Sequence, residues 1–233
     1  MDWQDDAIVL AVRPLGEGGA VVELLTRAHG RHAGLVRGAR SKNNRGVAQP
    51  GNRVSAAWRA RLADQLGQLS LELTTAHAAR AMEDPGRLAA LSAACALCHA
   101  VLPDRQPHGA AFEALDALLG ALAGDSWPSV YVHFELALLR DLGFGLDLSA
   151  CAATGDTRDL AYVSPKTGRA VSAAVGAAYR DKLLALPAFL TQGGEGDAAQ
   201  IRDGLALTGF FLERHVRPHL PPARDRLAGR FGG

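Results

Sequence analysis

The side chains in this sequence that are best suited to chemistry are four cations in one short polar stretch, Val36 to Pro50. The stretch contains no acid, and its cations are Arg37, Arg40, Lys42 and Arg45. Arg and Lys contact phosphate oxygens and release condensed counterions when they bind nucleic acid. A run of charge is also common in loops that are only solvated. No apolar run crosses the stretch, so we expect it to lie outside the core. On charge alone, it is either a solvated loop or a phosphate-binding site.

Positive charge is concentrated around this stretch. The chain has 233 residues and a net charge of +1, but residues 27–63 contain nine basic residues and no acidic one. A locally positive face is the electrostatic pattern of a nucleic-acid-binding surface. The next candidates for phosphate contact are therefore Arg31, Arg53, Arg59 and Arg61.

Two other motifs have simpler interpretations. Cys95, Cys98 and His99 match the haem-attachment pattern C-x-x-C-H and would supply half of a zinc site. They lie in an Ala/Leu-rich helical segment with no second C-x-x-C elsewhere, so we interpret the cysteines as buried core residues. Glycines 16, 18 and 19 precede a strand and no Gly-Lys-Ser/Thr follows them, which favours a hairpin turn over a phosphate cradle.

The elements that must position the basic stretch are short strands. Apolar and alternating runs predict strands at 7–12, 20–26, 32–36, 53–61 and 69–74, separated by Gly/Pro turns. Such a series is typical of a small barrel or sandwich, and a long basic loop between the third and fourth strands favours an OB-fold. Trp58 either stacks on a base or lies in the core, and the alternation favours the core.

After residue 79 the sequence becomes Ala/Leu-rich with helical spacing. We expect an α+β protein with an OB-fold domain at 1–79 and a helical domain at 80–233 that contains an irregular insertion at about 146–171. Helices are predicted at 85–102, 110–123, 128–142, 171–184 and 197–216, with a weak strand at 160–163. Another basic cluster lies on a tail or short helix and consists of Arg224, Arg226 and Arg230.

The chain start and the cysteine content indicate the compartment. Residues 1–6 are acidic and lack the apolar region of a signal peptide. No apolar run approaches the ~18–20 residues that span a bilayer. Three cysteines fit a reducing compartment rather than a disulfide framework. We therefore expect a cytoplasmic protein without membrane contact.

Three segments together resemble the RecO family of bacterial recombination mediators, over nearly the whole chain. The first is Gly38-Ala39-Arg40-Ser41-Lys42 with Gln49-Pro50. The second is Phe134 to Leu139 with Leu142 to Asp147, followed by Cys151 and Thr154-Gly155. The third is Tyr162 to Ser172. No single segment is specific, but their order and spacing are.

The resemblance implies an N-terminal OB-fold, a C-terminal helical bundle with a small insertion, and a role in DNA repair and recombination. It implies binding of single- and double-stranded DNA, annealing of complementary strands, and partnership with RecR and the tail of the single-strand-binding protein to help load RecA. Many members of the family carry a four-cysteine zinc knuckle in the insertion. Here only Cys151 matches a ligand, Thr154 stands at the second position, and residues 160–180 contain no Cys. We expect no metal and no cofactor, so packing must hold the insertion.

These observations predict a non-enzymatic DNA-binding mediator without catalytic residues. Two alternatives come from other classes, a metal-dependent nuclease and a structural adaptor without direct DNA function. A nuclease would need carboxylates clustered near the basic face, and residues 27–63 contain none.

Overall fold

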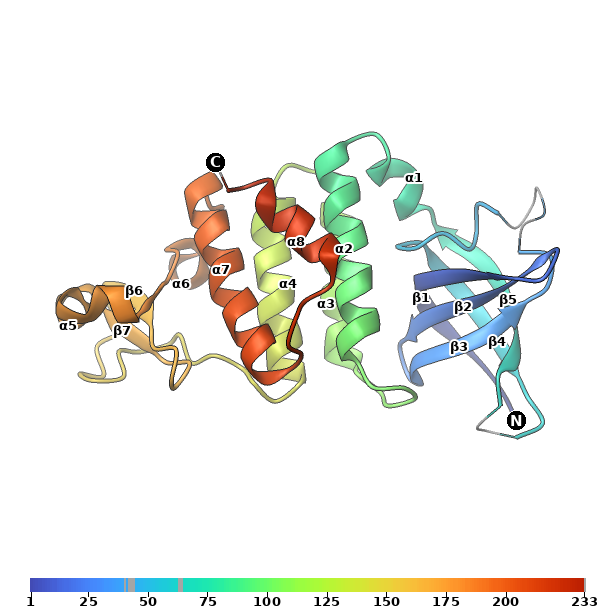
Figure 1. Cartoon of the computed structure of the whole chain (residues 1–233), viewed down its shortest axis with the longest axis horizontal. Coiled ribbons are helices and arrows are strands. Elements are labelled where there is room, and N and C mark those ends of the chain that lie inside the picture. Colours follow the sequence, from blue (N-terminus) through green and yellow to red (C-terminus); the bar gives the residue numbers. More distant parts are fainter. Residues whose placement is uncertain (40, 42–44, 63–64, 233) are drawn as a thin grey trace. The chain divides into compact units, whose positions relative to one another are not determined.

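The structure is a computed structural model that describes residues 1–39, 41, 45–62 and 65–232. The chain divides into two compact units, Met1–Gly124 and Asp125–Gly233. The first unit contains five strands and three helices, and the second contains further helices and a small sheet (Figure 1).

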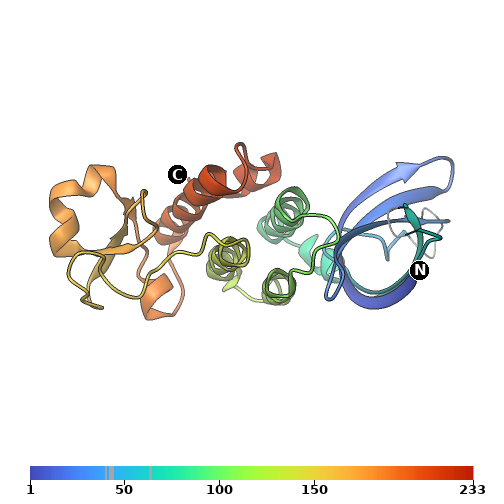
Figure 2. The ribbon, with the colours of Figure 1, turned by 90° about the horizontal axis from the view of Figure 1, so that it is seen from below.

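The first unit is built on a closed barrel (Figure 2). Its five strands have the order β1-β2-β3-β5-β4. Its strands are β1 (Asp2–Leu15), β2 (Gly19–Thr26), β3 (Gly30–Val36), β4 (Arg53–Arg59) and β5 (Gly67–Thr75). This confirms the five predicted strands, the hairpin turn at glycines 16–19 and the α+β fold class. The first strand is longer than predicted, because β1 pairs with β4 over residues 2–8 and with β2 over residues 7–15.

Alternation along the strands fills the barrel with small and branched apolar side chains. Val9, Val22, Leu24 and Val54 are fully buried there. Trp58 is also part of this core, and its indole Nε1 donates to the Ala33 carbonyl at 3.2 Å. The interpretation of Trp58 as a core residue is thus confirmed, and its ring is not free to stack on a base.

Three helices follow the barrel within the first unit: α1 (His77–Ala81), α2 (Pro85–Val101) and α3 (Gly109–Ala121). Helix α2 begins after Asp84, whose side chain caps it by accepting from the Gly86 and Arg87 amides. It packs against β1, where the Cys95 Sγ lies 3.7 Å from the Val9 carbonyl oxygen. Cys95 and Cys98 are both buried, and burial raises the pKa of the Cys95 thiol to about 12. The C-x-x-C-H cysteines are therefore core residues, as predicted.

The compact first unit extends beyond residue 79. Leu91 of α2 lies against Gly51, which has φ of +87°, and a Cβ at Gly51 would come within 2.5 Å of the Leu91 side chain. Asp116 of α3 forms an ion pair with Arg53 of β4. The helices up to α3 thus pack with the barrel in one unit, while the domain boundary at residue 79 stays a prediction.

The second unit combines long helices with a small antiparallel sheet. Its helices are α4 (Trp127–Asp141), α5 (Ala173–Gly176), the 3-10 helix η1 (Ala177–Lys182), α6 (Phe189–Gln192), α7 (Ala198–His215) and α8 (Pro222–Gly229). The sheet has the order β7-β6-β8, with β6 (Leu160–Val163), β7 (Ala170–Ser172) and β8 (Leu184–Ala185). No helix in the described part of the chain is long and apolar enough to cross a membrane.

The predicted helix at 171–184 is present only over residues 173–182, and its two ends are wrong. Residues 170–172 form strand β7 instead, with Val171 paired to Tyr162 and Ser172 paired to Leu160. All three β7 residues are buried, so pairing and burial override the helical propensity of this Ala-rich segment. Only the short helix α5 and the 3-10 helix η1 follow.

Candidate nucleic-acid interface

The barrel holds the basic stretch at both ends. Ala39 and Ala48 are buried in the barrel core cluster, and Val47 packs against it. Gly38, with φ of +63°, begins a turn in which the Ser41 amide donates to its carbonyl at 3.0 Å. The expectation that the whole stretch lies outside the core is therefore wrong, because its small apolar residues pack into the barrel core.

Asn52 fixes the end of the stretch. Its buried side chain donates from Nδ2 to the Gly46 carbonyl at 2.8 Å, and its Oδ1 accepts from the Ala78 amide at 3.0 Å. The Val9 amide donates to the Asn52 carbonyl at 3.0 Å. A buried amide that bonds to three segments is costly to leave unsatisfied, so Asn52 defines where the loop returns to the barrel.

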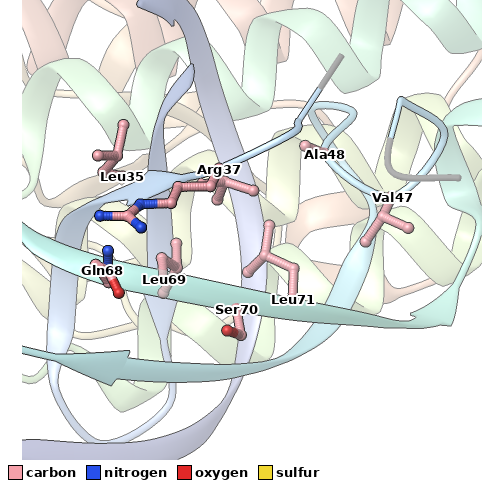
Figure 3. Close-up of a pocket in the computed structure, with 9 residues that line it drawn as sticks. Leu35, Arg37, Val47, Ala48, Gln68, Leu69, Ser70 and Leu71 are labelled. Carbon is pink, nitrogen blue, oxygen red and sulfur yellow. The ribbon is translucent and has the colours of Figure 1, made fainter. Parts of the chain in front are cut away.

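Arg37 and Arg45 are both exposed. The Arg37 guanidinium lies against the side-chain amide of Gln68 on β5 (Figure 3). With the amide oxygen turned toward it, Gln68 accepts from Arg37 Nη2 at 2.7 Å and Nε at 2.9 Å. The Arg45 amide donates to the Ser41 carbonyl at 3.0 Å. Arg40 and Lys42 lie outside the described residues.

Arg59 and Arg61 are exposed at the far end of β4. Arg59 is 3.8 Å from the carboxylate of Asp2, and both of these side chains are largely exposed, so water screens the pair. Arg59 and Gln68 both line a hollow of about 530 Å³ on the outside of the barrel. Because Gln68 also contacts Arg37, one outer surface of the barrel brings Arg37 and Arg59 together.

Arg31 and Arg53 have internal partners instead. Arg31 pairs with Glu23 and Asp104, each at 2.7 Å. Arg53 pairs with Asp116 at 2.8 Å and Asp6 at 3.0 Å, and this raises its pKa, chiefly through the hydrogen bond to Asp6. Both side chains are mostly buried, so their charges are neutralised where the barrel meets the segments that follow it.

The three C-terminal arginines also differ in how exposed they are. Arg224 is buried and donates from Nε and Nη2 to the two carboxylate oxygens of Glu135, at 3.1 and 3.0 Å. Arg226 and Arg230 are exposed on and just after α8. Arg224 is thus a structural residue of the second unit rather than an available cation.

The insertion is held without the zinc ligands of a knuckle. The Cys151 sulfur accepts hydrogen bonds from Thr154 and Ser172, which lower its pKa to about 6. Thr154 stands where a second zinc ligand would be and contacts the sulfur directly. Among the described residues, no group of three or more His, Cys, Asp or Glu side chains could hold a metal ion.

Sequence reasoning missed Gln68, Ser70 and Asn52. The first two face outward in the alternating run of β5, opposite the inward Leu69. Alternation could therefore have placed them on the same surface as Arg59. No local pattern marks Asn52, because its partners come from three separate segments.

The chain begins with an OB-fold barrel that carries a basic loop. A helical C-terminal region with a small insertion follows it. These two parts in this order define a class of two-part proteins. A family model described as "Recombination protein O N terminal" matches residues 1–77, and one described as "Recombination protein O C terminal" matches residues 82–222. The chain belongs to the RecO family of DNA repair proteins.

Individual relatives match over the whole chain. A protein of Rhodospirillum centenum is 56% identical over 237 residues, covering 99% of this chain and 95% of the relative. A protein of Phenylobacterium zucineum is 55% identical over 247 residues, covering 99% of this chain and 100% of the relative. Both carry the name DNA repair protein RecO. The family resemblance seen in the three sequence segments is thereby confirmed.

Proposed function

We propose that this chain is a recombination mediator that binds single- and double-stranded DNA through the barrel and anneals complementary strands. The observation that supports this most is a basic loop without acids, anchored at Ala39, Ala48 and Asn52 on an OB-fold barrel. Arg37 and Arg45 are exposed beside these anchor residues, and backbone-directed Arg and Lys contacts bind any sequence.

Annealing requires no covalent chemistry. Two strands must approach each other while their phosphate repulsion is neutralised and their base edges remain available. Arg37, Arg40, Lys42 and Arg45 are the proposed primary phosphate contacts, and Arg59 and Arg61 extend them along the barrel. The nuclease alternative would show as cleavage of labelled DNA in the presence of Mg²⁺, and we expect none.

The decisive experiment measures the salt dependence of DNA binding. Replacing Arg40, Lys42 and Arg45 with Ala should weaken binding to all sequences and reduce the slope of log K against log salt by about 2–3, since each phosphate contact contributes ~0.7–0.9. The matched control replaces three exposed cations of the second unit with Ala: Arg180, Lys182 and Arg202. An unchanged slope in the loop variant, or an equal reduction in the control, would reject the loop as the binding site.

The proposed partners are RecR, the tail of the single-strand-binding protein and, indirectly, RecA. A groove of about 370 Å³ on α4 supports the tail as a ligand, since Leu136, Leu146 and Leu148 line it beside the cation Arg140. An acidic peptide with an apolar end would complement these walls. Calorimetry with such a peptide should show binding that Arg140→Glu abolishes and Arg214→Glu does not, because Arg214 does not line the groove. We propose that the protein acts in the cytoplasm, where the chromosome lies.

A further inference from the structure

The barrel has an opening where the pairing of β3 with β5 ends. These two strands pair at only two positions, Gly34 with Gly67 and Leu35 with Gln68. Beyond them, β3 leads into Arg37 while β5 continues to Leu71. A hollow of about 250 Å³ lies between the two strands and is bordered on its third side by Val47 and Ala48 of the basic loop (Figure 3).

The walls of this hollow combine apolar surface with a polar rim. Leu35, Val47 and Leu71 contribute partly exposed aliphatic side chains, and none of the described residues that line the hollow is acidic. Gln68, Ser70 and Arg37 contribute the polar groups. When the Gln68 oxygen accepts from Arg37, its Nε2 is directed away from the guanidinium, and the oxygen keeps a second lone pair for a donor.

The size and chemistry of the hollow fit a single planar ring system. Pockets for small organic ligands usually measure about 300–1,000 Å³, so this one is too small for a whole nucleotide. A nucleobase has two apolar faces and an edge of hydrogen-bond donors and acceptors. Aliphatic walls suit the faces, and the Gln68 amide and Ser70 hydroxyl suit the edge.

We propose that this hollow receives one unpaired nucleobase of a single strand whose phosphates lie on Arg37 and the basic loop. The proposal rests on the proposed DNA-binding function and extends it. A base in a duplex is paired along its edge and stacked on both faces, so it can enter only after leaving the stack, which costs a few kcal/mol. The hollow therefore distinguishes single strands from duplexes without reading sequence.

The residues around this hollow provide a surface along which the DNA strand can run. The larger outer hollow shares Gln68 and Ser70 with this one and adds Gln4 and Arg59. Among the described residues that line this outer hollow, Asp2 is the acidic one, and it lies beside Arg59. Glu72, the next outward residue of β5, lines neither hollow. A strand with one base inserted can thus run from Arg37 toward Arg59 with a cation on each side of the base.

The test fills the hollow and compares strands with and without bases. The variant Ser70→Phe places a ring in the opening. The matched control is Thr74→Phe, an exposed position on the same strand that lines neither hollow. The probes are oligothymidine and an abasic strand of the same length and charge, with binding measured by fluorescence anisotropy at one salt concentration.

The wild-type protein and Thr74→Phe should bind oligothymidine about tenfold more tightly than the abasic strand, which corresponds to ~1.4 kcal/mol. Ser70→Phe should lose this preference while retaining wild-type affinity for the abasic strand, which also shows that the variant is folded. Equal binding of both strands by the wild-type protein, or a preference that survives in Ser70→Phe, overturns the base site and leaves the DNA-binding function intact. Failure of the wild-type protein to bind either strand would instead reject the proposed function.

Discussion

At one end of the barrel, His32 lies in a cluster of rings. Its imidazole meets Trp58 edge-on at 4.8 Å and Trp3 edge-on at 5.1 Å, measured between ring centroids. Trp3 in turn stacks on His29 at 4.7 Å. Burial lowers the pKa of His32 to about 4, and the nearby Arg105 and His29 act in the same direction. His32 is therefore neutral in the folded protein at neutral pH.

This depressed pKa predicts that acid destabilises the fold. Between pH 6.5 and about 4 the unfolded chain binds a proton at His32 that the folded chain does not, so stability is fully present above pH 6.5 and falls as the pH drops through this window. Between pH 7.5 and pH 5 the loss is roughly 2 kcal/mol, at ~1.4 kcal/mol for each pH unit below 6.5. Denaturant unfolding of the wild-type protein and His32→Leu at pH 7.5 and pH 5 measures it.

The variant should lose less stability between the two pH values than the wild-type protein does. Burial also lowers the pKa values of His77 and His133, so a smaller acid effect should remain. The variant His133→Leu is a second test, and it should also lose less stability than the wild-type protein because burial lowers the pKa of His133. An identical pH dependence in His32→Leu and the wild-type protein would contradict this account of His32.

The local sequence pattern predicts which side chains are buried better than it predicts which charged side chains form ion pairs. Alternation and helical spacing correctly placed Trp58, Cys95 and Cys98 in the core, because burial follows from local pattern. The same reasoning grouped Arg31 and Arg53 with the exposed cations. Their partners include Asp104 and Asp116, which are distant in sequence, and charge spacing alone could not reveal them.

At the scale of elements, a buried ion pair attaches α8 to the rest of the second unit. Arg224 of α8 pairs with Glu135 of α4, and both side chains are buried. Thr208 of α7 donates its hydroxyl to the same carboxylate, and the Arg224 guanidinium also donates to the Leu205 carbonyl. The helices α4, α7 and α8 thus meet at one ion pair. The buried donors and acceptors there form hydrogen bonds with each other.

Breaking this pair should be strongly destabilising. Arg224→Met leaves the Glu135 carboxylate buried without its cation, which typically costs about 3–5 kcal/mol. The double variant Glu135→Leu with Arg224→Met should recover most of that loss, since an apolar replacement of a buried pair is often neutral. Arg226→Met on the exposed side of α8 is the matched control, and thermal unfolding measures all three.

A double variant as unstable as Arg224→Met would contradict this reading, because no unpaired charge would remain to explain the loss. The prediction also separates structural from binding roles among the C-terminal arginines. Arg224 belongs to the α4–α7–α8 junction, and only Arg226 and Arg230 are exposed for a ligand.

The insertion shows which elements local pattern cannot predict. The sequence correctly predicts a strand at 160–163, which is β6, whereas the predicted helix at 171–184 includes two residues of β7, Val171 and Ser172. β7 has only three residues, too few for a period of two to be distinguished from a helical period. Pairing with β6 and the hydrogen bonds to the Cys151 sulfur define it, and both depend on residues outside the strand itself.

For the whole molecule, two different divisions of the chain can be compared. The family models meet between residues 77 and 82, close to the predicted domain boundary at 79. The compact units instead divide after Gly124. The difference arises because α2 and α3 follow the barrel domain in sequence while packing against it through Leu91, Cys95 and Asp116.

The two divisions predict different behaviour for N-terminal fragments. A fragment of residues 1–124 retains α2 on β1 and the partners of Arg31 and Arg53, so we expect cooperative unfolding. A fragment of residues 1–79 exposes the β1 surface near Val9 and leaves Arg53 without Asp116. We expect a lower denaturant midpoint and binding of a hydrophobic dye.

Circular dichroism and denaturant titration of both fragments, beside the full chain, measure this difference. DNA binding provides an independent readout, because both fragments contain the basic loop and its anchor residues on the barrel. If the 1–79 fragment were as stable as the 1–124 fragment, the helices would contribute nothing to the barrel, and the boundary at 79 would be a folding boundary as well as a sequence boundary. If only the longer fragment folds and binds DNA with the salt slope of the full chain, the minimal DNA-binding unit includes α3.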